Sequence, residues 1–136
     1  MKKKQLPHDD VYARLGVSKI HGIGVIAIID IPKGTDPFKY DYGSDHGQYY
    51  KFPAEKLMKG LKPAIKKLYD DFCVFEDNNK TVWTPKSFNS ISVGWYLNHS
   101  REPNMRAEPE GEYFFALRDI KAGEELTVDY STYSDH

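Results

Sequence analysis

The chain has 136 residues, of which 19 are Lys or Arg and 20 are Asp or Glu, so its formal net charge is −1. This length predicts a single domain, and the balanced charge speaks against a general nucleic-acid binder, which needs a strongly positive surface. No apolar run approaches the roughly 20 residues of a membrane span, and polar residues follow Met1–Gln5 where a signal peptide would be hydrophobic. We expect a soluble, intracellular, cytoplasmic protein without membrane contact; nuclear and host-directed locations stay open.

Cysteine and histidine usage gives no indication of a metal site. Cys73 is the only cysteine, so it can form neither an internal disulfide nor a thiolate cluster, and the His residues show no ligand-like spacing. Cys73 also lies in an apolar segment without a neighbouring base, which argues against nucleophilic catalysis. Aromatic residues make up 14% of the chain, with 10 Tyr among them. They favour a β-rich fold, and tyrosines also bring polar hydroxyls to apolar sites.

Short β-branched segments in the first third of the chain predict strands at residues 11–17 and 23–29. Residues 30–34 (Asp-Ile-Pro-Lys-Gly) then form a turn. After this turn, aromatic residues alternate with polar ones as in a half-buried strand. These aromatic residues are Phe38, Tyr40 and Tyr42.

Apolar side chains recur at helical spacing between residues 53 and 72. Pro63 cannot lie inside an unbroken helix without the loss of a hydrogen bond. The segment is therefore expected to form two short helices that meet near Gly60, as an insert in a mainly β chain.

The rest of the chain reads as short strands. Residues 72–75 and 81–83 flank Asp77–Asn79 as a hairpin would, and a turn at 119–123 repeats the chemistry of 30–34. Strands are also expected at 112–118 and 125–130. The fold class is therefore α+β, mainly β. The expected parts of the single domain are a core (11–130), the helical insert (53–72) and a short C-terminal tail (131–136).

Two glycines two residues apart in His21-Gly22-Ile23-Gly24 would let backbone pass close to a bound molecule, although an ordinary turn also explains them. Further along, the apolar run Trp95–Leu97 ends in Asn98 and His99. If the run is a strand, this pair presents polar groups at the edge of a pocket; the alternative is local turn bonding.

The segment from Gly123 to Tyr130 is a turn followed by a strand. Alternation places Leu126 and Val128 on one face and Thr127 on the other, and Tyr130 falls with the apolar face. In the simplest interpretation Tyr130 is a core tyrosine whose hydroxyl is bonded to a carbonyl.

Together these segments resemble the SET-domain family of protein lysine methyltransferases. Asn98-His99-Ser100 with Pro103-Asn104 is similar to the NHSxxPN signature, Gly123–Tyr130 to GEELTxDY, and His21–Val25 to the N-terminal glycine motif. The resemblance spans about residues 11–130. It implies the SET fold, in which several small sheets carry a short helical insert and the C-terminal strand passes under a loop to make a pseudoknot.

The resemblance also implies transfer of methyl groups from S-adenosylmethionine to the side-chain amine of lysine in a protein or peptide, histones among the candidates. Tyr130 is the implied catalytic residue. The implied cofactor-binding residues are His21, Gly22, Ile23, Gly24, Asn98, His99 and Tyr130. An aromatic channel would admit the lysine; its implied residues are Tyr40, Tyr42, Tyr96 and Val128, and the spacing at Tyr40 and Tyr42 is ambiguous by one residue.

The chain departs from the family at two places. No cysteine follows Tyr130, so the zinc-binding segment that closes the lysine channel in many members is missing. Tyr133 would cover part of the channel, and we expect either a homodimer or a tail that becomes ordered only on binding. Val128 stands where the family often has Phe or Tyr, which leaves room for more than one methyl group.

Two other readings compete with the enzyme. One is a catalytically inactive SET-like module that binds lysine-containing peptides, and the other is a small β-rich interaction protein. Binding of S-adenosylmethionine separates these from an enzyme.

Overall fold

The computed structural model describes residues 6–38, 49–108 and 113–135. Among these residues the largest sheet has four strands, in the order β1-β2-β9-β6. Their bounds are Ala13–Val17 (β1), Ile23–Ala27 (β2), Glu125–Val128 (β9) and Asn98–His99 (β6). β2 pairs antiparallel with β1 and β9, whereas β6 runs parallel to β9. The last strand thus lies between two earlier ones, which is the arrangement expected of the C-terminal pseudoknot.

The four-stranded sheet shares a hydrophobic core with a smaller antiparallel sheet of β7 (Met105–Ala107) and β8 (Phe114–Ala116). We call these six strands and their connections the sheet region. Val25, Met105 and Leu126 have no exposed surface, and Val128 is 1% exposed. Burial of such apolar side chains is the main stabilising contribution in a chain without disulfides.

The turns at 30–34 and 119–123, which have similar sequences, lie side by side, and the aspartate of each turn accepts a hydrogen bond from the backbone of the other. Ile31 and Ile120 form an isolated antiparallel bridge. Asp30 Oδ1 accepts a hydrogen bond from Ala122 N at 2.9 Å, and Asp119 Oδ1 accepts one from Lys33 N at 2.8 Å. The repeated chemistry therefore has a structural role, since each aspartate satisfies backbone donors of the other turn.

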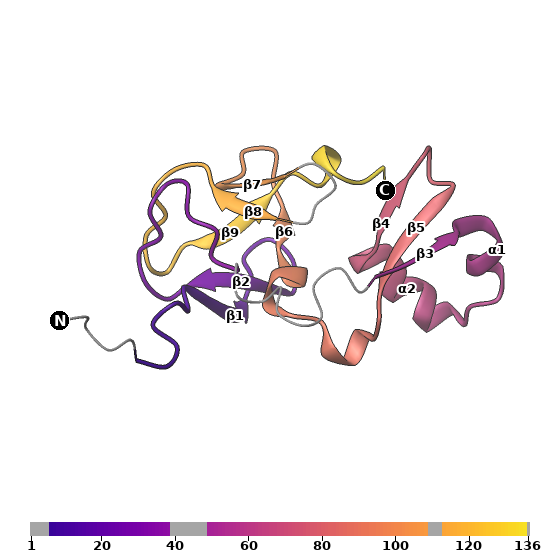
Figure 1. Ribbon diagram of the computed structural model, residues 1–136, viewed down its shortest axis with the longest axis horizontal. Coiled ribbons are helices and arrows are strands. Elements are labelled where there is room, and N and C mark those ends of the chain that lie inside the picture. The colour runs from indigo at the N-terminus through magenta and orange to yellow at the C-terminus, as the bar shows by residue number, and fades with distance from the viewer. Residues whose placement is uncertain (1–5, 39–48, 109–112, 136) are drawn as a thin grey trace.

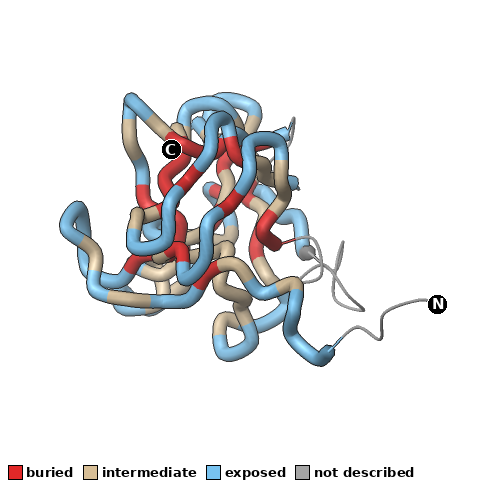
Figure 2. The backbone as a smooth tube through the Cα atoms, turned by 90° about the vertical axis from the view of Figure 1, so that its left-hand side faces the viewer, coloured by how far each residue is buried: buried red, intermediate tan, exposed pale blue. Residues whose placement is uncertain are grey.

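The remaining elements form the insert region. Its sheet has the order β3-β5-β4, with bounds Tyr49–Pro53 (β3), Thr81–Pro85 (β5) and Val74–Glu76 (β4). The helices α1 (Ala54–Lys59) and α2 (Pro63–Phe72) pack on it. A second core of buried residues holds the region together; it contains Ala54, Tyr69, Cys73, Phe75 and Val82. Figure 1 shows the insert region beside the sheet region, with the C-terminal end of the chain next to β4. Figure 2 shows the buried positions inside the molecule and the exposed ones at its outer bends.

The structure confirms the two helices, with Gly60 closing α1 and Pro63 in the first turn of α2. The hairpin around Asp77–Asn79 is confirmed as well. Four strands are shorter than expected: β1 starts at Ala13, β2 ends at Ala27, β8 spans Phe114–Ala116 and β9 ends at Val128. Ile28 and Ile29 are apolar but exposed, because the chain turns there toward Asp30.

For the apolar run Trp95–Leu97, the strand reading does not hold: its first residues end the 3-10 helix η2 (Val93–Tyr96), and Asn98 and His99 pair with β9 as β6. Tyr130, expected in the last strand, is instead the first residue of another 3-10 helix, η4 (Tyr130–Thr132). The Asp129 side chain caps this helix by accepting a hydrogen bond from Ser131 N. A third, η1, spans Phe88–Ser90.

Phe38 is buried in a turn, and Tyr40 and Tyr42 lie outside the described residues. No helix in the described ranges combines the length and apolarity needed to cross a membrane.

Candidate functional site

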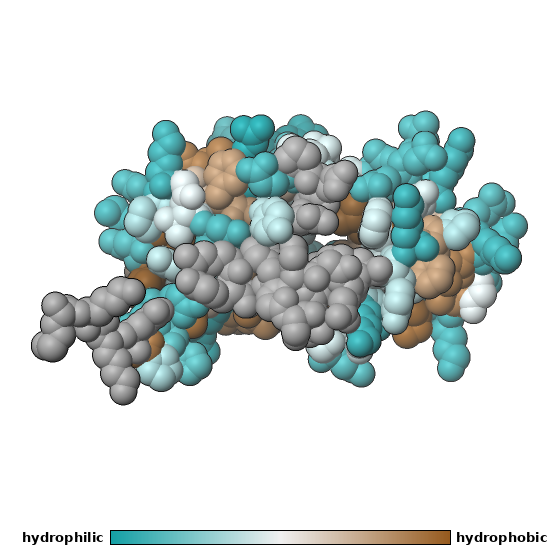
Figure 3. All heavy atoms as spheres, viewed as in Figure 1, coloured by the Kyte–Doolittle hydropathy of each residue, from teal (hydrophilic) through white to brown (hydrophobic). Residues whose placement is uncertain are grey.

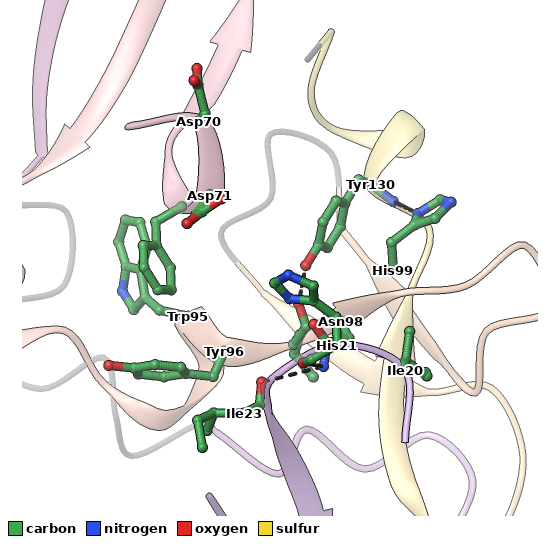
Figure 4. Close-up of a pocket in the computed structure, with 12 residues that line it drawn as sticks. Ile20, His21, Ile23, Asp70, Asp71, Trp95, Tyr96, Asn98, His99 and Tyr130 are labelled. Carbon is green, nitrogen blue, oxygen red and sulfur yellow. Dashed lines mark hydrogen bonds between the residues drawn. The ribbon is translucent and has the colours of Figure 1, made fainter. Parts of the chain in front are cut away.

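A pocket of about 490 Å³ has walls from both regions of the molecule. The sheet region contributes Ile20 and His21 from the loop before β2, Ile23 at the start of β2, the segment 95–99 and Tyr130. The insert region contributes the end of α2 at 70–72. In Figure 4 the Tyr130 hydroxyl points into the group, and Asp71 and Trp95 lie on the side opposite His99. Hydrophilic residues cover much of the outer edge of both regions on the face shown in Figure 3. The pocket, in contrast, has an aromatic lining of Phe72, Trp95, Tyr96 and Tyr130.

Tyr130 is fixed at both its backbone and its hydroxyl. Its hydroxyl donates to the carbonyl of Leu97, and its backbone N–H donates to His99 Nδ1 at 3.0 Å. The His99 ring also packs against the phenol, with 5.2 Å between centroids. Burial raises the pKa of Tyr130, and the carboxylates of Asp71 and Glu125 raise it further. The phenol therefore stays protonated at neutral pH and keeps lone pairs that can accept a hydrogen bond.

Asn98 is 7% exposed and lines the same pocket. Its amide nitrogen faces four acceptors at 2.9–3.3 Å, which are Ser18 Oγ, the carbonyls of His21 and Ile23, and Glu125 Oε2. These acceptors fix the orientation of the amide, because only the NH₂ end can donate to them. The Asn98 carbonyl oxygen consequently faces the other way, and none of the described residues donates to it.

Ser18, Asn98 and Glu125 form a hydrogen-bonded group that we call the polar hub, in which Asn98 is buried and the other two residues are partly exposed. Ser18 Oγ lies 2.8 Å from the Glu125 carboxylate and accepts from the backbone N–H groups of Ile20 and His21. The hub thus holds the loop before β2 by its backbone. Gly24 makes room for the hub, because a Cβ there would lie 2.4 Å from Glu125 Oε2. The second glycine of the motif therefore lets the chain's own side chains approach, whereas the sequence suggested a bound molecule.

Asn104 has a similar role on the other side of β9. Its side-chain oxygen accepts from Thr127 N at 2.8 Å, and its amide nitrogen donates to the carbonyl of Glu125 at 2.8 Å. Both asparagines of the NHSxxPN signature thus bind β9 or its side chains. These hydrogen bonds fix the position of β9, the strand that directly precedes Asp129 and Tyr130 in the chain.

The structure brings together most of the residues implied by the resemblance. His21, Ile23, Tyr96, Asn98, His99 and Tyr130 all line the pocket. Gly22 forms the adjacent turn with a positive φ of 49°, and Gly24 is buried against the hub. Val128, implied as a channel residue, is packed in the core of the sheet region instead of lining this pocket.

Sequence reasoning missed the contribution of α2. Asp70, Asp71 and Phe72 form one wall of the pocket, and the Phe72 ring packs edge-on against Tyr96 at 5.3 Å. Carboxylates at the C-terminal end of a helix interact unfavourably with the helix dipole. An ion pair between Lys67 Nζ and Asp71 Oδ1, at 2.7 Å, offsets part of this cost. An acidic pair at the end of a predicted helix was the available signal, but nothing in the sequence placed that end beside Tyr130.

Neither a metal-binding cluster nor an activated thiol offers a second catalytic centre in the part of the chain that the structure describes. Within the described ranges, no three His, Cys, Asp or Glu residues form a group able to hold a metal ion. Cys73 is buried, and burial together with Asp70 raises the pKa of its thiol to about 12. A thiol with this pKa is not a nucleophile at neutral pH.

The comparisons with known proteins agree with this geometry. The SET-domain family profile matches residues 22–131. The chain therefore belongs to the SET-domain family, whose members are typically protein lysine methyltransferases. No curated protein matches the chain.

Two solved structures show the same fold. A proposed histone methyltransferase of Plasmodium falciparum is 16% identical with a TM-score of 0.52, over 88% of this chain and 93% of its own. A humanized mutant of the Chaetomium thermophilum Polycomb Repressive Complex 2, bound to an inhibitor, is 21% identical with a TM-score of 0.59, over 93% of this chain and 16% of its own. The expected mainly β SET fold is confirmed.

Proposed function

We propose that this chain is a protein-lysine N-methyltransferase that uses S-adenosylmethionine. The observation that carries the proposal is that Tyr130 and Asn98, from segments far apart in the chain, line one pocket. An inactive binding module would need neither a protonated phenol nor an oriented amide in that place.

The pocket fits the cofactor in size and chemistry. Its volume lies within the roughly 300–1,000 Å³ of small-molecule sites. Trp95, Tyr96 and Phe72 offer aromatic surface for a nucleobase, and the Asn98 carbonyl oxygen is an acceptor for an ammonium group. Asp70 and Asp71 add negative charge that favours a cation. When bound, S-adenosylmethionine would supply an electrophilic methyl group on a positive sulfonium.

The residues of the chain would align and desolvate the reactants. The aromatic walls exclude water, and exclusion of water favours the neutral form of a lysine amine, which is the nucleophile. The Tyr130 hydroxyl donates to the Leu97 carbonyl, so its lone pairs are available to accept from the amine. His99 holds the Tyr130 backbone, so it acts on the reaction through Tyr130.

The substrate in this proposal is a lysine in a protein or peptide. Histones are the first to test, because one of the similar structures is described as a proposed histone methyltransferase. We further propose that the enzyme is intracellular and that a homodimer closes the lysine channel.

The direct test is a labelled methyl-transfer assay on a histone mixture and on a cell lysate. We expect wild type to label protein, and Tyr130→Phe to lower the rate on the order of 100-fold, since the hydroxyl that contacts the amine is lost. Tyr50→Phe is the matched control, because Tyr50 is half exposed on β3 in the insert region. Equal labelling by wild type and Tyr130→Phe would refute the role of the hydroxyl. Peptide binding without any transfer would support the inactive module.

A further inference from the structure

The C-terminal segment 131–135 is bonded to the insert region. Phe75 N donates to Ser134 Oγ at 3.1 Å, and Asp135 N donates to the Phe75 carbonyl at 2.8 Å. The Asp135 carboxylate accepts from the backbone N–H groups of Asn78 and Asn79 at 2.9 and 3.4 Å. This differs from the expectation that the tail becomes ordered only on binding.

The backbone of the β4–β5 turn is shaped to accept this carboxylate. Asp77, Asn78 and Asn79 have positive φ angles of 54°, 56° and 64°, in the left-handed region that Asn and Asp adopt more readily than other residues with a side chain. Consecutive residues in such turns direct their N–H groups into one concave anion-binding site. The turn therefore presents its backbone donors to an oxygen of Asp135.

The bonded segment connects the two walls of the pocket. On one side, Ser134 N donates to the carbonyl of Tyr130 at 3.0 Å. On the other side, Phe75 follows the end of α2 by three residues, and that end carries Asp71 and Phe72 into the pocket. A short chain of hydrogen bonds thus joins Tyr130 through Ser134 to Phe75 of β4, the strand that directly follows α2 in the chain. Tyr133 reinforces it by packing edge-on against the Tyr130 ring at 6.1 Å.

We propose that Ser134 and Asp135 form a latch that holds the insert wall of the pocket at a fixed separation from Tyr130. Asp135 is then a positioning residue, which acts on the cofactor through the pocket walls without contact of its own. The latch preorganises the pocket and so lowers the cost of binding. This inference rests on the proposed function, which it deepens.

The test compares Asp135→Ala and Asp135→Asn with wild type in the full chain. Without the carboxylate, the pocket is correctly closed in only a fraction of molecules, and the apparent affinity falls by that fraction. We expect Asp135→Ala to raise the KM for S-adenosylmethionine about tenfold while kcat changes less than about twofold. Asp135→Asn retains one acceptor oxygen, so we expect a smaller rise of about threefold. Glu55→Gln is the control, since its carboxylate is exposed on α1 in the same region.

Amide hydrogen exchange tests the latch independently of catalysis. In Asp135→Ala, exchange should accelerate at Asn78, Asn79 and the last turn of α2, while Val25 and Leu126 keep wild-type protection. Faster exchange at these sites with unchanged KM would overturn the positioning role, and unchanged exchange would overturn the latch itself. If wild type binds no S-adenosylmethionine, the proposed function is refuted, whereas the exchange result still decides whether the latch exists.

Discussion

Buried polar side chains distinguish the two regions of the molecule. In the described residues of the sheet region, Asn98, Asn104 and Thr127 are buried, and they bond to partners 21 to 80 residues away in the chain. In the insert region the buried side chains are apolar apart from Thr84, and β5 pairs both with its hairpin neighbour β4 and with β3, which precedes the two helices. Buried polar groups are costly unless every partner is in place. The sheet region therefore specifies one arrangement of the site, and the insert region supplies a wall for it.

The largest expected effect is in the core of the sheet region. Leu126→Ala should lower the free energy of unfolding by about 2–5 kcal/mol, because Leu126 is fully buried in the strand that leads to Tyr130. Val82→Ala, in the core of the insert region, removes a smaller side chain and should cost less. Denaturant unfolding measures both. Amide exchange in Val82→Ala should accelerate only in β3–β5; acceleration in β2 and β9 as well would break the distinction between the regions.

An intermediate effect is expected at the polar hub. Glu125→Gln replaces an acceptor of Ser18 and Asn98 with an amide whose NH₂ end cannot accept from them. We expect a loss of about 1–3 kcal/mol in unfolding free energy and faster amide exchange at Ile20 and His21. Glu102→Gln, at an exposed position of the sheet region, is the control. Stability and exchange equal to those of the control would show that the hub does not hold the loop.

An effect that appears only at high pH is expected in the insert region. The pKa of Cys73 is raised from 9.0 to about 12 by burial. The unfolded chain loses the thiol proton near pH 9 and the folded chain near pH 12, so the stability that this thiol contributes is present below pH 9 and lost as pH rises to 12. Unfolding free energy should thus fall more steeply over this range in wild type than in Cys73→Ala. Parallel pH profiles for the two proteins would contradict the burial of a neutral thiol.

The sequence predicted the parts of the site whose signal is local. The Asn98-His99 pair and Tyr130 stand in recognisable motifs, and Pro63 and Gly60 divide the helical insert at the correct place. Glu125 and Ser18 were missed because their role depends on a contact across 107 residues of chain. The wall formed by Asp71 and the latch at Asp135 depend on how the two regions pack, which neither periodicity nor spacing encodes.

The central claim is that the pocket between the two regions places the methyl group of S-adenosylmethionine beside Tyr130. The most direct measurement is NMR of the wild-type protein with S-adenosylmethionine labelled with ¹³C at that methyl. We predict intermolecular nuclear Overhauser effects from the methyl protons to the ring protons of Tyr130, with loss of the signals when unlabelled cofactor is added in excess. A bound cofactor whose methyl shows contacts only to residues outside the pocket, or the absence of binding, would contradict the account.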